Sequence, residues 1–306
     1  MYDIEKTEET DNTKKINKIK KAALFHDMSC YGRCALSVII PIISVLKVQP
    51  VIIPTALLST HTGGFSDFTF LDLTGEIKKI VAHYKKLDLV PDCVYTGFLV
   101  SDKQIEIIAD YIKEQKSKGA YIFVDPVMAD DGKLYSTYTE SMKQNMTKLV
   151  MSADIITPNI TEAFFLLGMN YQKPPYSEDL IDSIVFKLFE LCRYNNTEQS
   201  SVKSVVITSV ATENGKYGVA YGENLDNKNN KIETGRVFTR RYEKNYPGSG
   251  DIFSSILCAL LLNGTGFRES VECAVKFIDK VMEYTINAGT PVREGLIFEK
   301  FLGEIH

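Results

Sequence analysis

The chain has 306 residues, of which 44% are hydrophobic and 24% are charged, a balance typical of globular proteins that excludes collagen-like and wholly disordered chains. Lys and Arg (35) nearly balance Asp and Glu (39), so the net charge of -4 provides no positive field for nucleic acid or an anionic membrane. The six cysteines include no C-x-x-C pair and only four histidines accompany them, which favours buried reduced thiols over a zinc site or a disulfide framework.

Residues 1–20 carry many charges and few apolar side chains, and this composition predicts a mobile tail ahead of one domain over residues 21–306. The tail lacks an apolar segment followed by a cleavage site, which argues against a signal peptide. The longest uncharged apolar stretch, Ala35 to Leu46, is too short to cross about 30 Å of hydrocarbon. We therefore expect no membrane span and a cytoplasmic protein.

From Lys21 onward, short β-rich runs alternate with helical patterns, and several runs lack polar alternation, as strands covered on both faces should. The predicted strands are Ala22–Phe25, Val51–Ile53, Cys93–Tyr95, Tyr121–Val124, Ile155–Thr157 and Val205–Thr208. Two later runs, 217–221 and 232–242, are predicted to pair antiparallel across a polar loop at 222–231, and a second polar loop is expected at 194–204. This order predicts an α/β protein with a mostly parallel sheet, helices on both faces and a ligand site at the carboxyl ends of the strands.

Two helices follow clearly from the pattern. Ser101 and Gln104 have the spacing of a capping box ahead of an apolar stripe, and Gly119 ends that helix. A second helix is predicted from about Ser270 to Met282, again with one apolar stripe that can pack against a sheet.

The most informative segment is the turn Gly248-Ser249-Gly250-Asp251, which opens an apolar helical run that ends at Asn263-Gly264. Its glycines let backbone N–H groups converge on an anion, and the helix dipole adds partial positive charge, so the turn can hold a phosphate. The pattern fits neither a Walker A loop nor a dinucleotide-binding fingerprint. Taken alone, the spacing is equally consistent with Asp251 acting only as an N-terminal helix cap.

This turn resembles the G-[TAS]-G-D signature of the ribokinase-like (PfkB) kinases, in which the two glycines and the residue between them form an anion hole and the aspartate is the general base. Further segments resemble motifs of the vitamin B6 (pyridoxal/pyridoxamine) kinase branch in the same order: Thr60-His61-Thr62-Gly63, Asp125-Pro126-Val127-Met128, Ile156-Thr157-Pro158-Asn159 with Glu162, and Val206-Ile207-Thr208-Ser209. The resemblance covers about residues 21–290.

The resemblance implies a three-layer α/β/α sandwich that transfers the γ-phosphoryl group of ATP to the 5′-hydroxymethyl group of pyridoxal, pyridoxamine or pyridoxine, with Mg²⁺, in some members a monovalent cation such as K⁺, and a homodimeric assembly. In the matching positions the resemblance implies catalysis by Asp251 with Gly248, Ser249 and Gly250, and vitamer binding by Asp27, Ser29 and Thr62. It also implies ATP binding by Asn159, Thr208, Ser209 and Tyr135, and metal binding by Asp125, Glu162 and Thr157.

The residues themselves leave simpler roles open. Asp125 can belong to a plain turn after its strand, and Glu162 can complete a capping box with Asn159. Thr208 and Ser209 can be turn formers, Tyr135 a surface tyrosine, and the glycines and threonines around His61 favour a hydrogen-bonded loop residue over a catalyst.

Other functions also stay open. Residues 26–33 depart from the Ser-His opening that is usual in the B6 branch, and they resemble the T-D-x-S-G segment of the hydroxymethylpyrimidine kinases of thiamine synthesis. A kinase for that pyrimidine or its phosphate is therefore the nearest alternative. A B6-binding protein without activity is an alternative from another class, although a binder does not need Asp251 in its turn. A sugar or nucleoside kinase is less consistent with residues 60–63.

Overall fold

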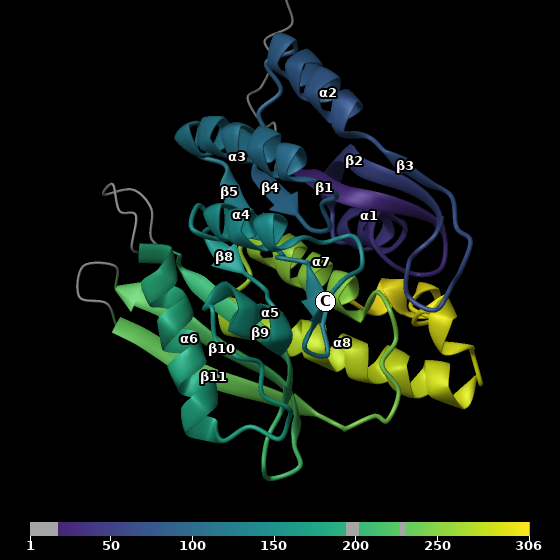
Figure 1. Ribbon diagram of the computed structural model, residues 1–306, viewed down its shortest axis with the longest axis vertical. Coiled ribbons are helices and arrows are strands. Elements are labelled where there is room, and N and C mark those ends of the chain that lie inside the picture. Colours follow the sequence, from purple (N-terminus) through teal and green to yellow (C-terminus); the bar gives the residue numbers. More distant parts are fainter. Residues whose placement is uncertain (1–17, 194–201, 227–230, 306) are drawn as a thin grey trace, which may run out of the picture.

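The computed structural model describes residues 18–193, 202–226 and 231–305. Among these residues, nine strands form one sheet in the order β11-β10-β9-β8-β5-β4-β1-β2-β3 (Figure 1). The strands are β1 (Lys20–Tyr31), β2 (Val48–Thr60), β3 (Phe70–Asp72), β4 (Cys93–Thr96), β5 (Tyr121–Val124), β8 (Ile155–Ile156), β9 (Ser204–Ala211), β10 (Tyr217–Asp226) and β11 (Lys231–Thr239). A separate hairpin pairs β6 (Ala129–Asp130) with β7 (Lys133–Leu134).

The six central strands, from β9 to β2, all pair in parallel, whereas β3, β10 and β11 join antiparallel at the two edges. The strands β4, β5, β8 and β9 carry no exposed residues because helices cover both faces, whereas β1 and β2, which lie nearer the β3 edge, include several exposed residues. Parallel strands bring their carboxyl ends to one edge of the sheet, and this edge carries the loops described below.

The helices divide between the two faces of the sheet, as the two hydrophobic clusters show. One face is covered by α2 (Thr74–Lys86), α3 (Asp102–Ser117), α4 (Glu140–Val150), α5 (Ile160–Leu166) and α6 (Glu178–Arg193). The other is covered by α1 (Leu36–Val45), α7 (Ser249–Leu262) and α8 (Phe267–Asn287), followed by the short helices η1 (Val292–Glu294) and η2 (Glu299–Glu304). The prediction of a three-layer α/β/α sandwich is therefore confirmed.

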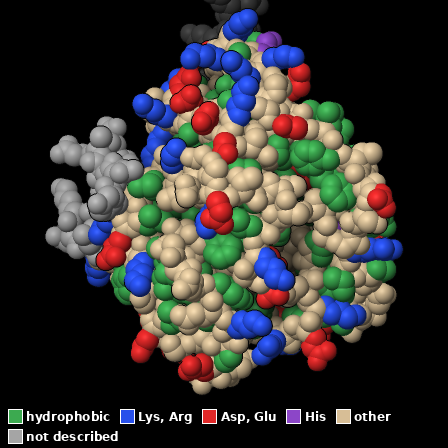
Figure 2. Space-filling model, viewed as in Figure 1, with side chains coloured by type: hydrophobic (Ala, Val, Ile, Leu, Met, Phe, Trp, Pro, Cys, Tyr) green, Lys and Arg blue, Asp and Glu red, His purple; other side chains and the backbone are tan. Residues whose placement is uncertain are grey.

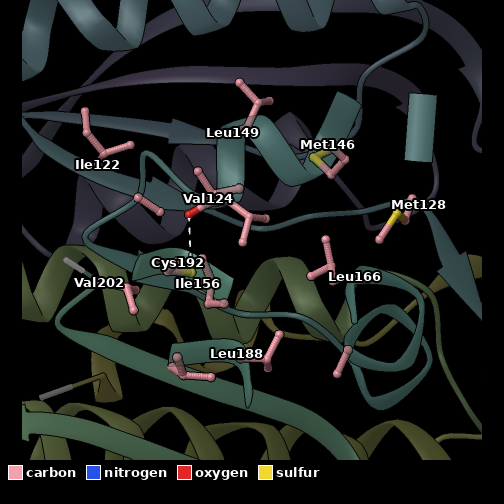
Figure 3. Packing of buried hydrophobic residues seen from close by; sticks show 14 of the residues in the cluster. Ile122, Val124, Met128, Met146, Leu149, Ile156, Leu166, Leu188, Cys192 and Val202 are labelled. Carbon is pink, nitrogen blue, oxygen red and sulfur yellow. Dashed lines mark hydrogen bonds between the residues drawn. The ribbon is translucent and has the colours of Figure 1, made fainter. Parts of the chain in front are cut away.

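Figure 3 shows the core between β5, β8 and the helices α4 to α6. Ile122 and Val124 of β5 and Ile156 of β8 face Met146, Leu149 and Leu188 of the helices, all completely buried. Within this cluster the Cys192 thiol donates a weak hydrogen bond to the Val150 carbonyl at 3.7 Å. Residues 122–124 and 155–156 thus form a fully covered sheet centre, as the absence of polar alternation predicts.

The cysteine prediction is confirmed in part. Cys34, Cys93, Cys192 and Cys258 are buried, whereas Cys30 is exposed. The Sγ atoms of Cys93 and Cys258 lie 3.8 Å apart, well beyond the roughly 2.05 Å of a disulfide bond.

Among the described residues, no helix has the length and apolar character needed to span a membrane.

Several element boundaries differ from the predictions. Residues 222–226 belong to β10 rather than to a loop, because Gly222 and Glu223 pair with both neighbouring strands and Asn224 pairs with β11. The strand β11 ends at Thr239 rather than at 242. β2 spans 13 residues instead of three, and β1 already begins at Lys20. Residues 1–17, 194–201 and 227–230, where the tail and most of the two polar loops were expected, lie outside the described residues.

The helix α3 has half of the predicted capping box. The Ser101 hydroxyl accepts the Gln104 N–H, but the Gln104 side chain accepts from Val100 and donates to the Thr55 carbonyl. Gln104 is fully buried and so ties α3 to β2 instead of closing the box. The helix α3 ends at Ser117, and Gly119 follows its C-cap with a positive φ, as a helix-ending glycine should. The helix α8 extends beyond the predicted range at both ends.

Figure 2 shows one face of the molecule, on which acidic and basic side chains are interspersed among neutral ones. Hydrophobic side chains gather toward the edge formed by β2 and β3. There Leu57, Phe70 and Leu71 are exposed.

The core of Figure 3 leads to a stability prediction. Leu188→Ala should lower the free energy of unfolding by about 2–5 kcal/mol, because Leu188 is completely buried and its loss leaves a cavity. The matched control is Leu87→Ala, where the leucine side chain is 58% exposed, and here we expect a change within about 0.5 kcal/mol. Urea unfolding measures both, and equal effects of the two substitutions would contradict the packing described.

Candidate active site

The glycine-rich turn begins α7 and packs closely against the loop that follows β1. Gly248 is the N-cap residue with φ +79°, a left-handed conformation that favours glycine. A Cβ atom at Gly248 would lie only 2.0 Å from the Arg33 carbonyl oxygen, so both the conformation and the contact require glycine. Gly250 has no protein atom within 4 Å of a Cβ position, so packing does not explain this second glycine. Its surroundings leave room for a ligand to approach the backbone.

Asp251 lies in the first turn of α7, but its carboxylate does not cap that helix. Oδ2 accepts the backbone N–H of Ala35 at 2.7 Å, a bond between segments 216 residues apart in the sequence. The N-cap residue Gly248 offers no side-chain cap, and no bond from Asp251 to its own helix replaces one. The reading of Asp251 as a helix cap is therefore wrong, and the carboxylate is held in place by the loop after β1.

Two cavities open at the carboxyl edge of the sheet. The first, here called the α8 cavity, has a volume of about 250 Å³ and lies between the glycine-rich turn, β10 and α8. Polar groups from the strand ends line one side of it, and Val219, Val275, Ile278 and Met282 line the other. Lys244 is its one basic lining residue in the part of the chain that the structure describes.

The second cavity, here called the β2 cavity, has a volume of about 420 Å³ and lies between the loops that follow β1 and β2. Apolar side chains such as Leu58, Phe98 and Leu134 line it together with polar groups that include Asp27, His61, Thr62 and Lys133. A pocket that combines an apolar wall with convergent polar groups is typical of a site for a small molecule.

The two cavities meet at one place. Both are lined by Asp251, Gly248, Tyr135, Val127 and Asp130. A group at Asp251 can therefore contact ligands in both cavities at once, with the backbone of the glycine-rich turn beside it.

A buried network lies beneath this junction. The Ser254 hydroxyl lies 3.0 Å from Oδ2 of Asp125, to which it donates, and 3.1 Å from the Thr157 hydroxyl. Asp125 directly follows β5, Thr157 follows β8, and Ser254 lies one turn along α7 from Asp251. The network thus connects two strand ends with the helix that carries the glycine-rich turn.

Glu162 is buried and braces the neighbouring loop. One carboxylate oxygen accepts the Asn159 N–H at 2.8 Å, and the other accepts the Met128 N–H at 3.0 Å. The Asn159 side chain accepts the Glu162 N–H in return, so the predicted capping box of α5 is confirmed. The Asn159 amide also donates to the Ala129 carbonyl at 2.7 Å, which leaves it bound within the protein at the wall of the α8 cavity.

Burial raises the pKa values of the clustered carboxylic acids, and their mutual repulsion adds to the effect. The pKa of Asp125 rises to about 8 through burial and the charge of Asp251. Burial and the charge of Asp251 likewise raise the pKa of Asp27 to about 7, and burial raises that of Asp251 to about 6. The pKa of Glu162 lies well above its usual range because of burial and the charge of Asp125. The site therefore favours a ligand that brings positive charge.

The other predicted site residues are distributed as follows. Ser249, Thr208 and Ser209 line the α8 cavity, and Ser209 has a left-handed backbone with φ +60°. Tyr135 follows the hairpin β6–β7, where its N–H donates to the Met128 carbonyl, and it lines both cavities rather than the outer surface.

One predicted binding residue differs from what the pattern suggests. Ser29 is completely buried and does not line the β2 cavity; its hydroxyl donates to Asp27 at 3.0 Å and so orients that carboxylate. His61 is a hydrogen-bonded loop residue, as predicted, because Nδ1 accepts the Gly63 N–H and Nε2 lies 2.7 Å from the Arg293 carbonyl oxygen.

The sequence reasoning missed Ser254 and the Ala35 N–H. For Ser254 a signal was present, since a serine three residues after Asp251 lies on the same face of an otherwise apolar helix. No local pattern indicates the Ala35 N–H, because it depends on a contact between distant segments. Within the described residues, no three His, Cys, Asp or Glu side chains cluster in a way that could hold a metal ion directly.

Known proteins share this architecture. The pyridoxal kinase PdxY of Histophilus somni is 29% identical over 202 residues, which make up 65% of this chain and 65% of that protein. The match thus spans just under two thirds of this curated relative. A Bacteroides thetaiotaomicron structure described as a phosphomethylpyrimidine kinase, in a crystal form with pyridoxal, is 35% identical with a TM-score of 0.83 and covers 94% of this chain and 96% of that chain.

Residues 40–294 match the phosphomethylpyrimidine kinase family. The chain belongs to this family. The crystal structure of pyridoxal kinase from Lactobacillus plantarum is also similar, with 26% identity, a TM-score of 0.81 and coverage of 94% of this chain and 96% of that one. The resemblance to the vitamin B6 kinase branch, read from five short motifs, is confirmed by these likenesses.

The raised pKa of Asp125 leads to a pH-dependent stability prediction for this family member. Because the carboxyl holds its proton more tightly in the folded state, its contribution to the free energy of unfolding is complete below about pH 4 and is lost as the pH rises toward about 8. Asp125→Asn, which stays neutral, should therefore gain stability relative to wild type as the pH rises from 5 to 8. Chemical denaturation at both pH values measures the difference. The exposed Asp110→Asn is the control, and a constant difference for Asp125→Asn would contradict the burial described.

Proposed function

We propose that the protein transfers the γ-phosphoryl group of ATP to the 5′-hydroxymethyl group of a B6 vitamer: pyridoxal, pyridoxamine or pyridoxine. The observation that carries this proposal is the junction of the two cavities at Asp251 and Gly248. Phosphoryl transfer requires a donor and an acceptor in line with a group between them that takes the acceptor's proton. The α8 cavity takes the nucleotide, and the β2 cavity takes the acceptor ring.

In this proposal Asp251 accepts the proton of the 5′-hydroxyl group. Its pKa of about 6 leaves it largely ionised at neutral pH while keeping it close to the working pH, which suits a general base. The bond from the Ala35 N–H fixes one carboxylate oxygen at the junction. The other oxygen is then available to the acceptor hydroxyl.

The backbone N–H groups of residues 248–251 stabilise the negative charge that develops on the transferred phosphoryl group. They lie at the positive end of the 14-residue helix α7, and the space beside Gly250 admits the phosphate. Most of the rate enhancement then comes from positioning and electrostatics, because the transition state of phosphoryl transfer is loose and needs little covalent assistance.

Mg²⁺ fits the α8 cavity on electrostatic grounds. ATP carries several negative charges, whereas the described residues of the cavity wall include Asp125, Asp130, Glu162 and Asp251 against one basic residue, Lys244. Besides burial, the charge of Asp251 raises the pKa of Asp125 and the charge of Asp125 raises that of Glu162, so a divalent cation would favour the ionised form of both. We propose that Asp125, Thr157 and Glu162 hold Mg²⁺ through water molecules, where the ion would neutralise phosphate charge.

The acceptor ring is oriented by few polar groups in this proposal. Thr62 offers a hydroxyl, and Asp27, positioned by Ser29, accepts from the 3-hydroxyl group or pairs with a protonated ring nitrogen. Thr208, Ser209 and Tyr135 contact the nucleotide from the wall of the α8 cavity, while Asn159 shapes that wall through its own bonds. We also propose that the protein is a homodimer in the cytoplasm and that it requires K⁺.

The second candidate is phosphorylation of hydroxymethylpyrimidine or its phosphate. The specific observation in its favour is Asp27, because a buried carboxylate in the β2 cavity can accept from the exocyclic amine of an aminopyrimidine as well as from a B6 vitamer. The chemistry at Asp251 is the same for both rings.

The role of Asp251 leads to a kinetic prediction. Asp251→Asn should lower kcat by a factor on the order of 10² to 10⁴, the usual contribution of a general base, while ATP binding and the melting temperature stay close to wild type. Coupled measurement of ADP release gives kcat, and calorimetry gives nucleotide affinity. The control Asp110→Asn, on the exposed side of α3, should retain wild-type turnover. A turnover near wild type in Asp251→Asn would remove the residue from the mechanism.

The β2 cavity leads to a prediction about substrate choice. Pyridoxal or pyridoxamine should be phosphorylated with a kcat/KM about tenfold or more above hydroxymethylpyrimidine, a ratio that needs only about 1.4 kcal/mol and so one well-placed polar contact. Thr62→Val should raise KM for the vitamer more than KM for ATP, and Thr62→Ser, which keeps the hydroxyl, should restore it. Equal or reversed efficiencies on the two rings would assign the protein to the pyrimidine substrate.

A further inference from the structure

One segment contacts both loops of the β2 cavity without lining the cavity itself. This segment, here called the C-terminal turn, comprises residues 291–295 and includes the short helix η1. The proposed function uses none of its side chains. Its contacts nevertheless reach the loop after β2, which carries Thr62, and the loop after β1, which contacts Asp251.

The first contact is made by His61, a residue that is only 8% exposed. Because Nδ1 accepts the Gly63 N–H at 3.1 Å, the ring proton lies on Nε2, which donates to the Arg293 carbonyl at 2.7 Å. Phe65 packs edge-to-face on the His61 ring at 5.0 Å, and the Arg293 guanidinium lies 5.2 Å from the Phe65 ring centre. His61 therefore fixes the loop on both sides of Thr62.

The residues around this contact are closely packed. A Cβ atom at Gly32 would lie 2.6 Å from the His61 ring, and one at Gly64 would lie 3.2 Å from the Arg293 side chain. Both glycines also have positive φ values, so each position requires glycine for its backbone conformation as well as for the space beside it. The loop after β1, the His61 ring and the C-terminal turn form one packed unit.

The second contact is made by Arg33. Its N–H donates to the Glu294 carbonyl at 3.1 Å, and its guanidinium donates to the same carbonyl at 3.3 Å. A Cβ atom at Gly295 would lie 2.7 Å from the Arg33 carbonyl oxygen, the same atom that packs against Gly248. Arg33 is thus held between the C-terminal turn and the glycine-rich turn, two residues before the Ala35 N–H that binds Asp251.

We propose that the C-terminal turn is a positioning element of the β2 cavity and that His61 is the positioning residue through which it holds Thr62. Through Arg33 the same turn sets the position of Asp251. The proposal rests on the proposed function, because it assigns acceptor binding to the β2 cavity. His61 also lines the β2 cavity, and the proposal assigns to it the bond to the Arg293 carbonyl rather than a catalytic step.

The test compares steady-state kinetics of His61→Ala, His61→Gln and the control His83→Ala, with pyridoxal and ATP varied separately. His83 is exposed near the end of α2, far from either cavity wall, so its substitution should change nothing. His61→Ala should raise KM for pyridoxal about tenfold and leave KM for ATP within about twofold, because Thr62 lines only the β2 cavity. His61→Gln, whose amide keeps a donor for the carbonyl, should recover most of the loss.

A second pair of variants tests the Arg33 contact. Gly295→Ala should lower kcat at least about tenfold, because the new methyl group pushes Arg33 away from Gly248 and disturbs the bond to Asp251. Gly289→Ala is the matched control, since Gly289 also has a positive φ, at +68°, but no atom lies within 4 Å of its Cβ position. It should retain the wild-type kcat.

The outcomes separate this proposal from the proposed function. If wild type phosphorylates neither B6 vitamers nor hydroxymethylpyrimidine, the proposed function fails and this proposal fails with it. If wild type is active but His61→Ala changes neither KM, or raises both equally, only the positioning role is overturned. A selective rise in KM for pyridoxal that His61→Gln reverses supports it.

Discussion

The arrangement of the site depends on the contact between the Arg33 carbonyl and Gly248. A side chain at residue 248 would overlap that carbonyl, so the loop after β1 can lie directly on the first turn of α7 only because the residue is glycine. This contact brings the Ala35 N–H to Asp251, and it makes Asp251 a wall of both cavities.

The electrostatics of the site follow from burying several carboxyl groups together. Asp27, Asp125 and Glu162 are each less than 10% exposed, and their pKa values rise because burial disfavours the charged form and Asp251 or a neighbour repels it. A fold does not gain stability from such a cluster. The cluster instead favours cations, which agrees with a site that binds a metal-bound polyphosphate beside an acceptor bearing hydrogen-bond donors.

The sequence was sufficient for features that depend on local pattern. Buried runs such as 121–124 identify parallel strands, and the glycine-rich turn identifies the start of its helix, because each is determined by a few adjacent residues. Features that depend on distant contacts were missed. Ser29 has the pattern of a ligand-binding serine but donates to Asp27. Residues 222–226 have the composition of a loop but extend β10, where Gly222 and Glu223 pair with strands on both sides. Neighbouring strands, not local propensity, determine these outcomes.

The separation of chemistry from recognition follows from the same geometry. The glycine-rich turn and Asp251 belong to α7, whereas Asp27 and Thr62 belong to loops after β1 and β2. Substitutions in those loops can therefore change the ring that is accepted without moving the phosphoryl-transfer groups, provided that Arg33 keeps its place. This chain matches the phosphomethylpyrimidine kinase family and also resembles a pyridoxal kinase, and such a separation would let one architecture serve both acceptors. Under the proposed function, the side chains of the β2 cavity determine the acceptor, and the backbone that joins both cavities serves the reaction.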